Sequence, residues 1–113
     1  MKPAEIALGA VSNVYSRQMV FRHAGDYEQG HTHEFDHLTL LASGSLKVTV
    51  DGQVTVFKAP HMIYIHKDKM HELVALEDNT VAFCIHALRD MEGNVVDPTM
   101  VPNGVNAEEA CQQ

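Results

Sequence analysis

The stretch SLKVTVDGQVTVFK, residues 45–58, has the pattern of a β-hairpin. Apolar side chains occupy every second position of residues 46–50, and the same alternation returns in residues 54–56. Between these runs, Asp51-Gly52 can adopt the positive φ angles that a tight two-residue turn requires. The stretch therefore predicts two antiparallel strands joined at Asp51-Gly52.

Short apolar runs on both sides of this hairpin predict further strands. Turn-forming residues separate the runs, and none of them shows a convincing helical period. Such regular spacing indicates an all-β fold, either an antiparallel sandwich or a small barrel. The runs are QMVFRH (18–23), HLTLLA (37–42), HMIYI (61–65), HELVAL (71–76) and TVAFCIHAL (80–88).

With 113 residues, the chain is long enough for one hydrophobic core and too short for a second. We expect one barrel over residues 18–88, preceded by an N-terminal arm, residues 1–17. Residues 89–113 change character, because Pro, Gly, Asn and Asp interrupt them repeatedly. This C-terminal tail either packs on the barrel or on a partner subunit, or it forms a disordered end.

The net charge argues against several classes of partner. Eight Lys plus Arg stand against fifteen Asp plus Glu, a formal charge of −7, whereas nucleic acids and anionic membranes attract basic surfaces. With no Trp, three Tyr and four Phe, the chain also has little material for stacking single-stranded bases. We therefore expect a small molecule, a metal or a second copy of the chain as partner, with no nucleic acid and no membrane.

Cysteine usage and the apolar segments indicate a compartment. Cys84 lies inside an apolar run and Cys111 lies near the end of the chain, so a stabilising disulfide is not expected. The first 18 residues do not have the pattern of a signal peptide, and no segment approaches the roughly 20 apolar residues of a membrane span. We expect a reducing compartment, the cytoplasm.

The stretch HTHEFDH, residues 31–37, contains three of the eight histidines of the chain. His31 and His33 lie two positions apart and therefore point to the same side of an extended segment. If the whole stretch were one straight strand, His31 and His37 would lie roughly 20 Å apart, too far to share a metal. Either these histidines are ordinary polar side chains on a strand, or the chain bends at residues 34–36 and they bind one metal.

The segment GDYEQGHTHEFDHLTLLASG, residues 25–44, resembles the first sequence motif of the cupin superfamily. That motif has a glycine, five residues, His-x-His, three or four residues, a glutamate, six residues and a glycine. His37 stands at the glutamate position. The residues that match the motif are Gly25, His31, His33 and Gly44.

The segment HKDKMH, residues 66–71, resembles the second cupin motif, P-x-G-x-x-H. His71 keeps the histidine, while His66 and Asp68 replace the proline and the glycine. Asp tolerates left-handed backbone angles better than most residues, so the turn can survive this change. The two matches together span residues 25–71, and the strand pattern extends the resemblance to about residue 88.

The resemblance implies a cupin-type antiparallel β-barrel, also called a double-stranded β-helix or jelly roll. It further implies one divalent metal per chain. In this arrangement His31 and His33 lie at the end of one strand, residues 34–36 form the bend, and His37 starts the next strand. Most cupins use three histidines and one carboxylate, whereas this chain is similar to small cupins of the four-histidine type. Imidazole ligands suit several transition metals, and Mn, Fe, Ni and Zn all stay open. The implied ligands are His31, His33, His37 and His71.

A metal held by four neutral imidazoles favours Lewis-acid chemistry. We therefore expect a small metalloenzyme that acts on a small oxygenated metabolite, as a dioxygenase or as an isomerase, cyclase or lyase. A metal-containing binding or sensing domain without turnover is the alternative. A metal-free barrel that binds a hydrophobic ligand is a third interpretation, and the fold alone does not choose among them.

Three further residues are candidates for the site, each with a structural alternative. Tyr64 could direct its hydroxyl to a substrate, or it could pack in the core. His86 and Cys84 alternate on one face of the last predicted strand, and this face could line the cavity. His86 could equally be a core histidine, and Cys84 could be a small buried apolar residue.

Both faces of the run HLTLLA are partly apolar, which has a consequence for assembly. If His37, Thr39 and Leu41 face the cavity, Leu38 and Leu40 face outward and require cover. We expect a homodimer on this ground.

Overall fold

The computed structural model describes residues 1–31, 37–66, 69–88, 92 and 94–95. In this part of the chain the regular structure consists entirely of β-strands. The strands are β1 (Glu5–Val11), β2 (Val14–Phe21), β3 (Tyr27–His31), β4 (His37–Ser43), β5 (Ser45–Val50), β6 (Gln53–Lys58), β7 (His61–Ile65), β8 (His71–Ala75) and β9 (Thr80–Ala87).

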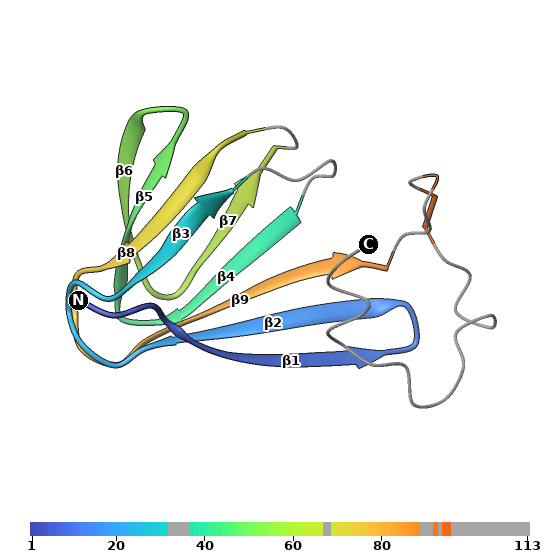
Figure 1. The fold of residues 1–113 in the computed structure, drawn as a ribbon, viewed down its shortest axis with the longest axis horizontal. Helices are drawn as coiled ribbons and strands as arrows, with labels where there is room; N and C mark the ends of the chain where they lie inside the picture. The colour runs from blue at the N-terminus through green and yellow to red at the C-terminus, as the bar shows by residue number, and fades with distance from the viewer. Residues whose placement is uncertain (32–36, 67–68, 89–91, 93, 96–113) are drawn as a thin grey trace.

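The strands form two antiparallel sheets. One has the order β1-β2-β9-β4-β7, and the other has the order β3-β8-β5-β6. Figure 1 shows the two sheets meeting near the N-terminus and separating toward the opposite end. This arrangement is a double-stranded β-helix, so the predicted all-β class and barrel architecture are confirmed. No helix in the described residues is long and apolar enough to span a membrane.

The predicted hairpin is confirmed in detail. Strands β5 and β6 pair from Ser45 opposite Lys58 to Val50 opposite Gln53. Asp51 and Gly52 have φ angles of 47° and 83°, as a tight turn between twisted strands requires.

One strand was not predicted from the sequence, and another was predicted only at its end. Residues 1–17, which we expected as an arm, contain all of β1 and the start of β2, and these two strands form a hairpin at the edge of the five-stranded sheet. The signal was weak because six of the seven residues of β1 are exposed and show no alternation. For β3, the resemblance predicted a strand end at His31, and β3 does contain His31 as its last residue. The rest of the strand was not predicted, because the sequence YEQGH contains almost no apolar residue and a register shift interrupts the strand.

The main core fills the closed end of the barrel, between the two sheets. Phe21, Leu41 and Leu46 are completely buried there. Each lies on a strand where alternate residues point inward, as the period of two predicts. The apolar interior therefore fixes the inward face of every strand that continues toward the open end.

Gly44 joins β4 to β5 at the closed end and has a φ of 81°. A Cβ at this position would lie 2.8 Å from Cβ and 2.9 Å from Cα of Thr80, which is itself fully buried. Both the backbone angle and the close approach exclude a side chain. This gives a physical reason for the last glycine of the first motif.

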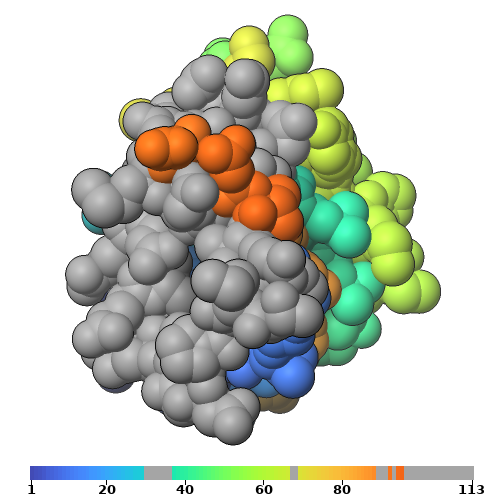
Figure 2. Space-filling view, turned by 90° about the vertical axis from the view of Figure 1, so that its right-hand side faces the viewer, coloured from blue at the N-terminus to red at the C-terminus, as the bar shows by residue number. Residues whose placement is uncertain are grey.

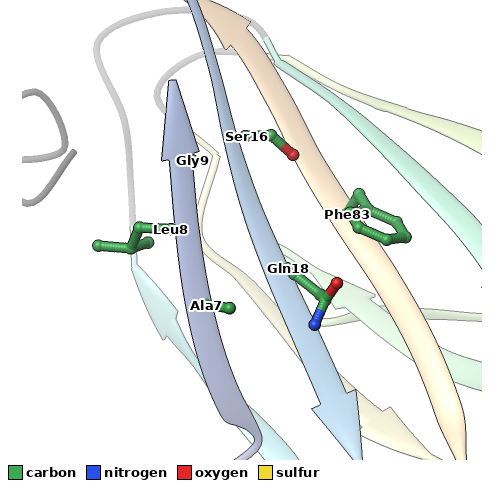
Figure 3. Close-up of a pocket in the computed structure, with 6 residues that line it drawn as sticks. All are labelled: Ala7, Leu8, Gly9, Ser16, Gln18 and Phe83. Atoms are coloured by element: carbon green, nitrogen blue, oxygen red, sulfur yellow. The ribbon is translucent and has the colours of Figure 1, made fainter. Parts of the chain in front are cut away.

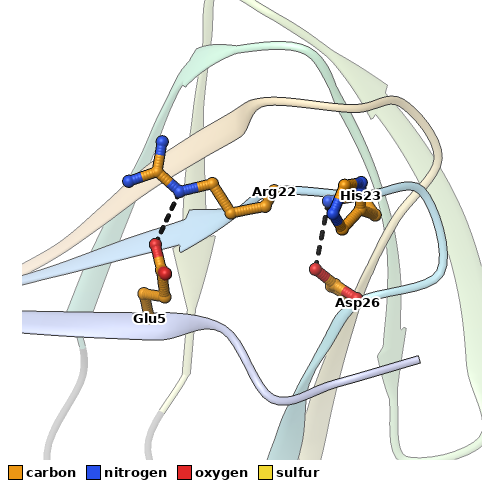
Figure 4. A network of polar contacts seen from close by, with 4 residues as sticks. All are labelled: Glu5, Arg22, His23 and Asp26. Carbon is orange, nitrogen blue, oxygen red and sulfur yellow. Dashed lines mark hydrogen bonds and ion pairs between the residues drawn. The ribbon is translucent and has the colours of Figure 1, made fainter.

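Polar contacts attach the N-terminal segment to the closed end (Figure 4). The Asp26 carboxylate accepts hydrogen bonds from the backbone N–H groups of Lys2 and His23, both at 3.0 Å. These two bonds, the one from Lys2 first, hold the pKa of Asp26 below its usual value of 3.8. Nearby, Nε of Arg22 pairs with Glu5 at 2.6 Å, but on the exposed surface.

Candidate metal centre

Three of the histidines in the motifs lie at the open end of the barrel, where strands of both sheets begin or end. His31 is the last residue of β3, His37 is the first residue of β4, and His71 is the first residue of β8. The prediction that His37 begins a new strand is confirmed. The topology therefore brings backbone positions far apart in sequence to one end of the fold (Figure 1).

A register shift in β3 determines which residue lies opposite His71. Glu28 pairs with Leu73, but His31 pairs with His71, so β3 uses one residue more than β8 between these two pairs. Such a bulge changes the register of everything beyond it. Without it, Gly30 rather than His31 would be opposite His71.

The His37 side chain points into the barrel. It is 4% exposed, and the alternate residues Thr39 and Leu41 on the same strand are 1% and 0% exposed. Leu38 and Leu40 are only half-buried. The predicted inward and outward faces of this strand are confirmed.

His71 meets His37 from the other sheet. It is 5% exposed and alternates with buried Leu73 on β8. The ring centroids of His37 and His71 are 5.0 Å apart, with an interplanar angle of 50°. Two imidazoles bound to one metal through bonds of about 2.1 Å, roughly 100° apart, would have centroids separated by roughly 5 Å. The observed pair therefore fits a shared metal.

The hydrogen bond of His71 identifies the nitrogen that can bind a metal. Its Nδ1 lies 3.2 Å from the backbone carbonyl oxygen of Lys69. A carbonyl only accepts, so Nδ1 carries the proton and donates, and the neutral ring presents the lone pair of Nε2. Histidine ligands in metalloproteins commonly have their second N–H held in this way.

The remaining proposed ligands are described only in part. His33 and the predicted bend at residues 34–36 lie outside the described residues, and His31 is described by its backbone position. Within the described part of the chain, no group of three or more His, Cys, Asp or Glu side chains is placed to hold a metal. The structure thus assembles two of the four predicted ligands, His37 and His71.

Solved structures with the same architecture include three that cover most of this chain. KdgF from Halomonas sp. superposes with a TM-score of 0.65 at 19% identity, over 77% of this chain and 80% of the other. A cupin 2 domain-containing protein from Halorhodospira halophila gives 0.67 at 18% identity, over 97% and 77%. An RmlC-like cupin family protein with a double-stranded β-helix fold, from Methanocaldococcus jannaschii, gives 0.63 at 12% identity, over 74% and 81%.

The chain has the cupin fold. No protein-family model matches the sequence, and no curated protein matches it. The cupin fold predicted from the two motifs is therefore confirmed by structural similarity, although the sequence identities are low.

Of the other candidates, Tyr64 lies on β7 with its side chain on the outer face of the barrel. It is 56% exposed, alternates with buried Ile63 and Ile65 on β7, and packs edge-on against His66 at 4.8 Å. The structure does not bring its hydroxyl to the histidine pair. The predicted role at the cavity does not agree with this position, because the alternation of β7 directs Tyr64 outward.

Cys84 and His86 lie on β9, where inward positions alternate with outward ones. Cys84 is partly buried, lies opposite Thr39 in the β4–β9 register and packs against the main core. The His86 ring lies 4.5 Å from the ring of buried Tyr15, and its Nδ1 lies 3.0 Å from the backbone oxygen of Ala87. Both residues occupy the wall of the barrel rather than the contact between the two buried histidines.

Phe83 is on the opposite face of β9, as its alternation with Cys84 predicts. There it borders a shallow pocket of about 220 Å³ on the outside of the five-stranded sheet (Figure 3). The other lining residues are small or uncharged, which gives this pocket no titratable group. They are Ala7, Leu8, Gly9, Ser16 and Gln18.

Sequence reasoning missed one charged pair inside the fold. Nη1 of Arg17, on β2, lies 2.6 Å from Oε1 of Glu28, on β3. The signal was the alternation of Tyr15, Arg17 and Met19, which places a charge on a buried face. It was overlooked because the predicted strand began at residue 18.

Proposed function

We propose that this protein is a small metal-binding cupin that acts on a small oxygenated molecule at the open end of its barrel. The observation that carries the proposal is the buried pair His37 and His71, contributed by different sheets with rings 5.0 Å apart. His31 and His33 complete the proposed ligand set. A divalent ion held by these neutral imidazoles would supply Lewis-acid chemistry, polarising an oxygen of the bound molecule.

The residues of the chain contribute orientation and shielding from water. The Lys69 carbonyl fixes the tautomer and rotation of the His71 ring. Ile65, opposite His37, is buried, and Val50 lies opposite His71. These apolar neighbours exclude water from the back of the site, which strengthens electrostatic interactions within it.

A binding or sensing domain without turnover is the second candidate. The outward position of Tyr64 and the packing of His86 on Tyr15 favour it, since neither residue is placed as a general base beside His37 and His71. Exchange of metal-bound water discriminates the two candidates. Rapidly exchanging water favours an enzyme, and a metal closed to solvent favours a structural or sensing role.

Metal analysis of untagged protein tests the proposal. After removal of metal and reloading with Mn, Fe, Ni or Zn in turn, we expect about one equivalent of at least one metal to stay bound. His71→Ala should abolish this binding while the β-sheet signal in circular dichroism is retained. His66→Ala, at an exposed position, is the matched control. Failure of every metal to bind would refute the proposal.

We also propose that the partner is a second copy of the chain and that the compartment is the cytoplasm. Cysteine usage supports the compartment, and the outer face of the five-stranded sheet supports the homodimer. Here β4 and β7 lie side by side at the surface (Figure 2). Across β7, β4 and β9, two cross-strand rows on this face are formed by aromatic and aliphatic side chains, some of them exposed. They are Tyr64, Leu38 and Ile85 in one row, and Met62, Leu40 and Phe83 in the other.

A further inference from the structure

Arg17 is a charged residue on the inward face of a strand. Its neighbours at alternate positions on β2, Tyr15 and Met19, are 1% and 2% exposed. In the β2–β9 register Arg17 lies opposite Cys84, which packs against the main core. The fold therefore directs a guanidinium toward the space between the two sheets.

The partner of Arg17 comes from the other sheet. Glu28 lies opposite buried Leu73 on β8, so it too faces inward, and its Oε1 accepts a hydrogen bond from Nη1 of Arg17 at 2.6 Å. The two side chains are 24% and 13% exposed. The pair bridges the two sheets, and part of it remains in contact with solvent.

Stability alone is a weak explanation for this pair. Removing two charges from water costs free energy that their attraction repays only in part, and apolar residues of similar volume often do as well. The exposed pair of Arg22 and Glu5 has the same separation of 2.6 Å without this cost. An arginine on the inward face of a strand is better explained by a ligand.

Glu28, the partner of Arg17, lies near His71 in the four-stranded sheet. Glu28 is opposite Leu73, and His71 is two residues from Leu73 on the same face of β8. Diagonal neighbours of this kind in an antiparallel pair have backbones roughly 7–8 Å apart. Because Nη1 of Arg17 is hydrogen-bonded to Glu28, a ligand of a few carbon atoms has about the length needed to reach from His71 to the guanidinium.

We propose that Arg17 binds the carboxylate of a small organic acid whose other oxygen atoms reach the histidine pair. The inference rests on the proposed function and names its substrate class. Guanidinium has five N–H donors in a planar fork that matches a carboxylate, and Glu28 engages Nη1. Glu28 therefore holds the guanidinium in position and competes with the carboxylate of the ligand for it.

This role predicts opposite effects for the two members of the pair. Arg17→Met removes the carboxylate-binding group and should weaken binding by about tenfold or more. Glu28→Gln removes the competing negative charge and should tighten binding by about threefold or more. A pair that only joins the sheets would instead respond similarly to both substitutions, with reduced stability and no change in binding.

The test is a titration of the full-length chain with acetate, succinate and glutarate, and with succinamide as the neutral counterpart. Calorimetry measures affinity in protein as purified and after removal of metal by a chelator. Arg17→Lys provides a variant that keeps the charge and the pairing with Glu28 but loses the fork, in case Arg17→Met does not fold. Arg22→Met and Glu5→Gln are the matched controls at the exposed pair.

The expected result is binding of at least one carboxylate but not of succinamide, weakened in Arg17→Lys and Arg17→Met, tightened in Glu28→Gln and unchanged in the controls. Absence of carboxylate binding, or binding that the changes at Arg17 and Glu28 leave unaltered, overturns the inference. The metal-free titration separates this outcome from the proposed function. If the protein bound no metal, carboxylate binding at Arg17 would still be expected. If Arg17 bound no carboxylate, metal uptake would be unchanged.

Discussion

Gly44→Ala is the substitution whose cost can be worked out most fully from the structure. The φ of Gly44 is 81°, and an L side chain in this left-handed region costs about 1–2 kcal/mol. The new Cβ would also lie 2.9 Å from Cα of Thr80. Rotation of the Thr80 side chain cannot relieve a contact with its own backbone, so β9 must move away, at an overpacking cost of about 1–3 kcal/mol.

The two contributions together predict a loss of about 2–5 kcal/mol in the free energy of unfolding. Urea denaturation measures this loss directly, and for a chain of this size the melting temperature should fall by roughly 10–20 °C. Gly52 has a φ of 83°, but no atom lies within 4 Å of a Cβ added there, so Gly52→Ala measures the cost of the backbone angle without a close contact. Gly9→Ala has neither feature and should leave stability almost unchanged. If Gly44→Ala were no worse than Gly52→Ala, the close approach to Thr80 would have no energetic consequence.

Two further predictions concern the closed end and the outer face. Because hydrogen bonds hold the pKa of Asp26 below 3.8, its stabilising contribution is complete above about that pH and is lost as the pH falls through the lowered value of the folded state. Asp26→Asn should therefore reduce the free energy of unfolding at pH 7 and make that free energy fall less as the pH is lowered. Urea unfolding from pH 7 down through the lowered pKa of Asp26 measures both effects. A difference between variant and parent that is the same at every pH would contradict the reasoning. Met62→Lys places a charge at a position that is 65% exposed in the single chain and that the proposed dimer would cover. The sedimentation coefficient at micromolar concentration should therefore fall from that of a dimer to that of a monomer. A parent protein that is itself a strict monomer would refute the proposed interface.

The sequence predicted the strands that combine a clear alternation with turn residues on both sides. The hairpin at Asp51-Gly52 is the clearest case, because local turn chemistry and binary pattern agree there. β1 escaped prediction, and β3 was predicted only at its His31 end, for opposite reasons. β1 is an exposed edge strand with no burial pattern, whereas β3 directs Glu28 inward, where its partner Arg17 comes from another strand.

The candidate site shows the same division between local and long-range information. The two motifs predicted that His37 and His71 belong together, and the structure places their rings in contact across the two sheets. Spacing could not reveal the Lys69 carbonyl as the acceptor for His71, because that contact depends on the turn before β8. The pairing of Arg17 with Glu28 depends on the register of two sheets, which no local pattern contains.

Anomalous diffraction from crystals of the metal-loaded protein tests the central claim most directly. Data collected at the absorption edge of the bound metal should give one peak per chain, located between His37 and His71. Nε2 of His71 should be the coordinating atom, with Nδ1 still bonded to the carbonyl of Lys69. A peak elsewhere on the chain, or a His71 ring that does not coordinate the metal, would contradict the account.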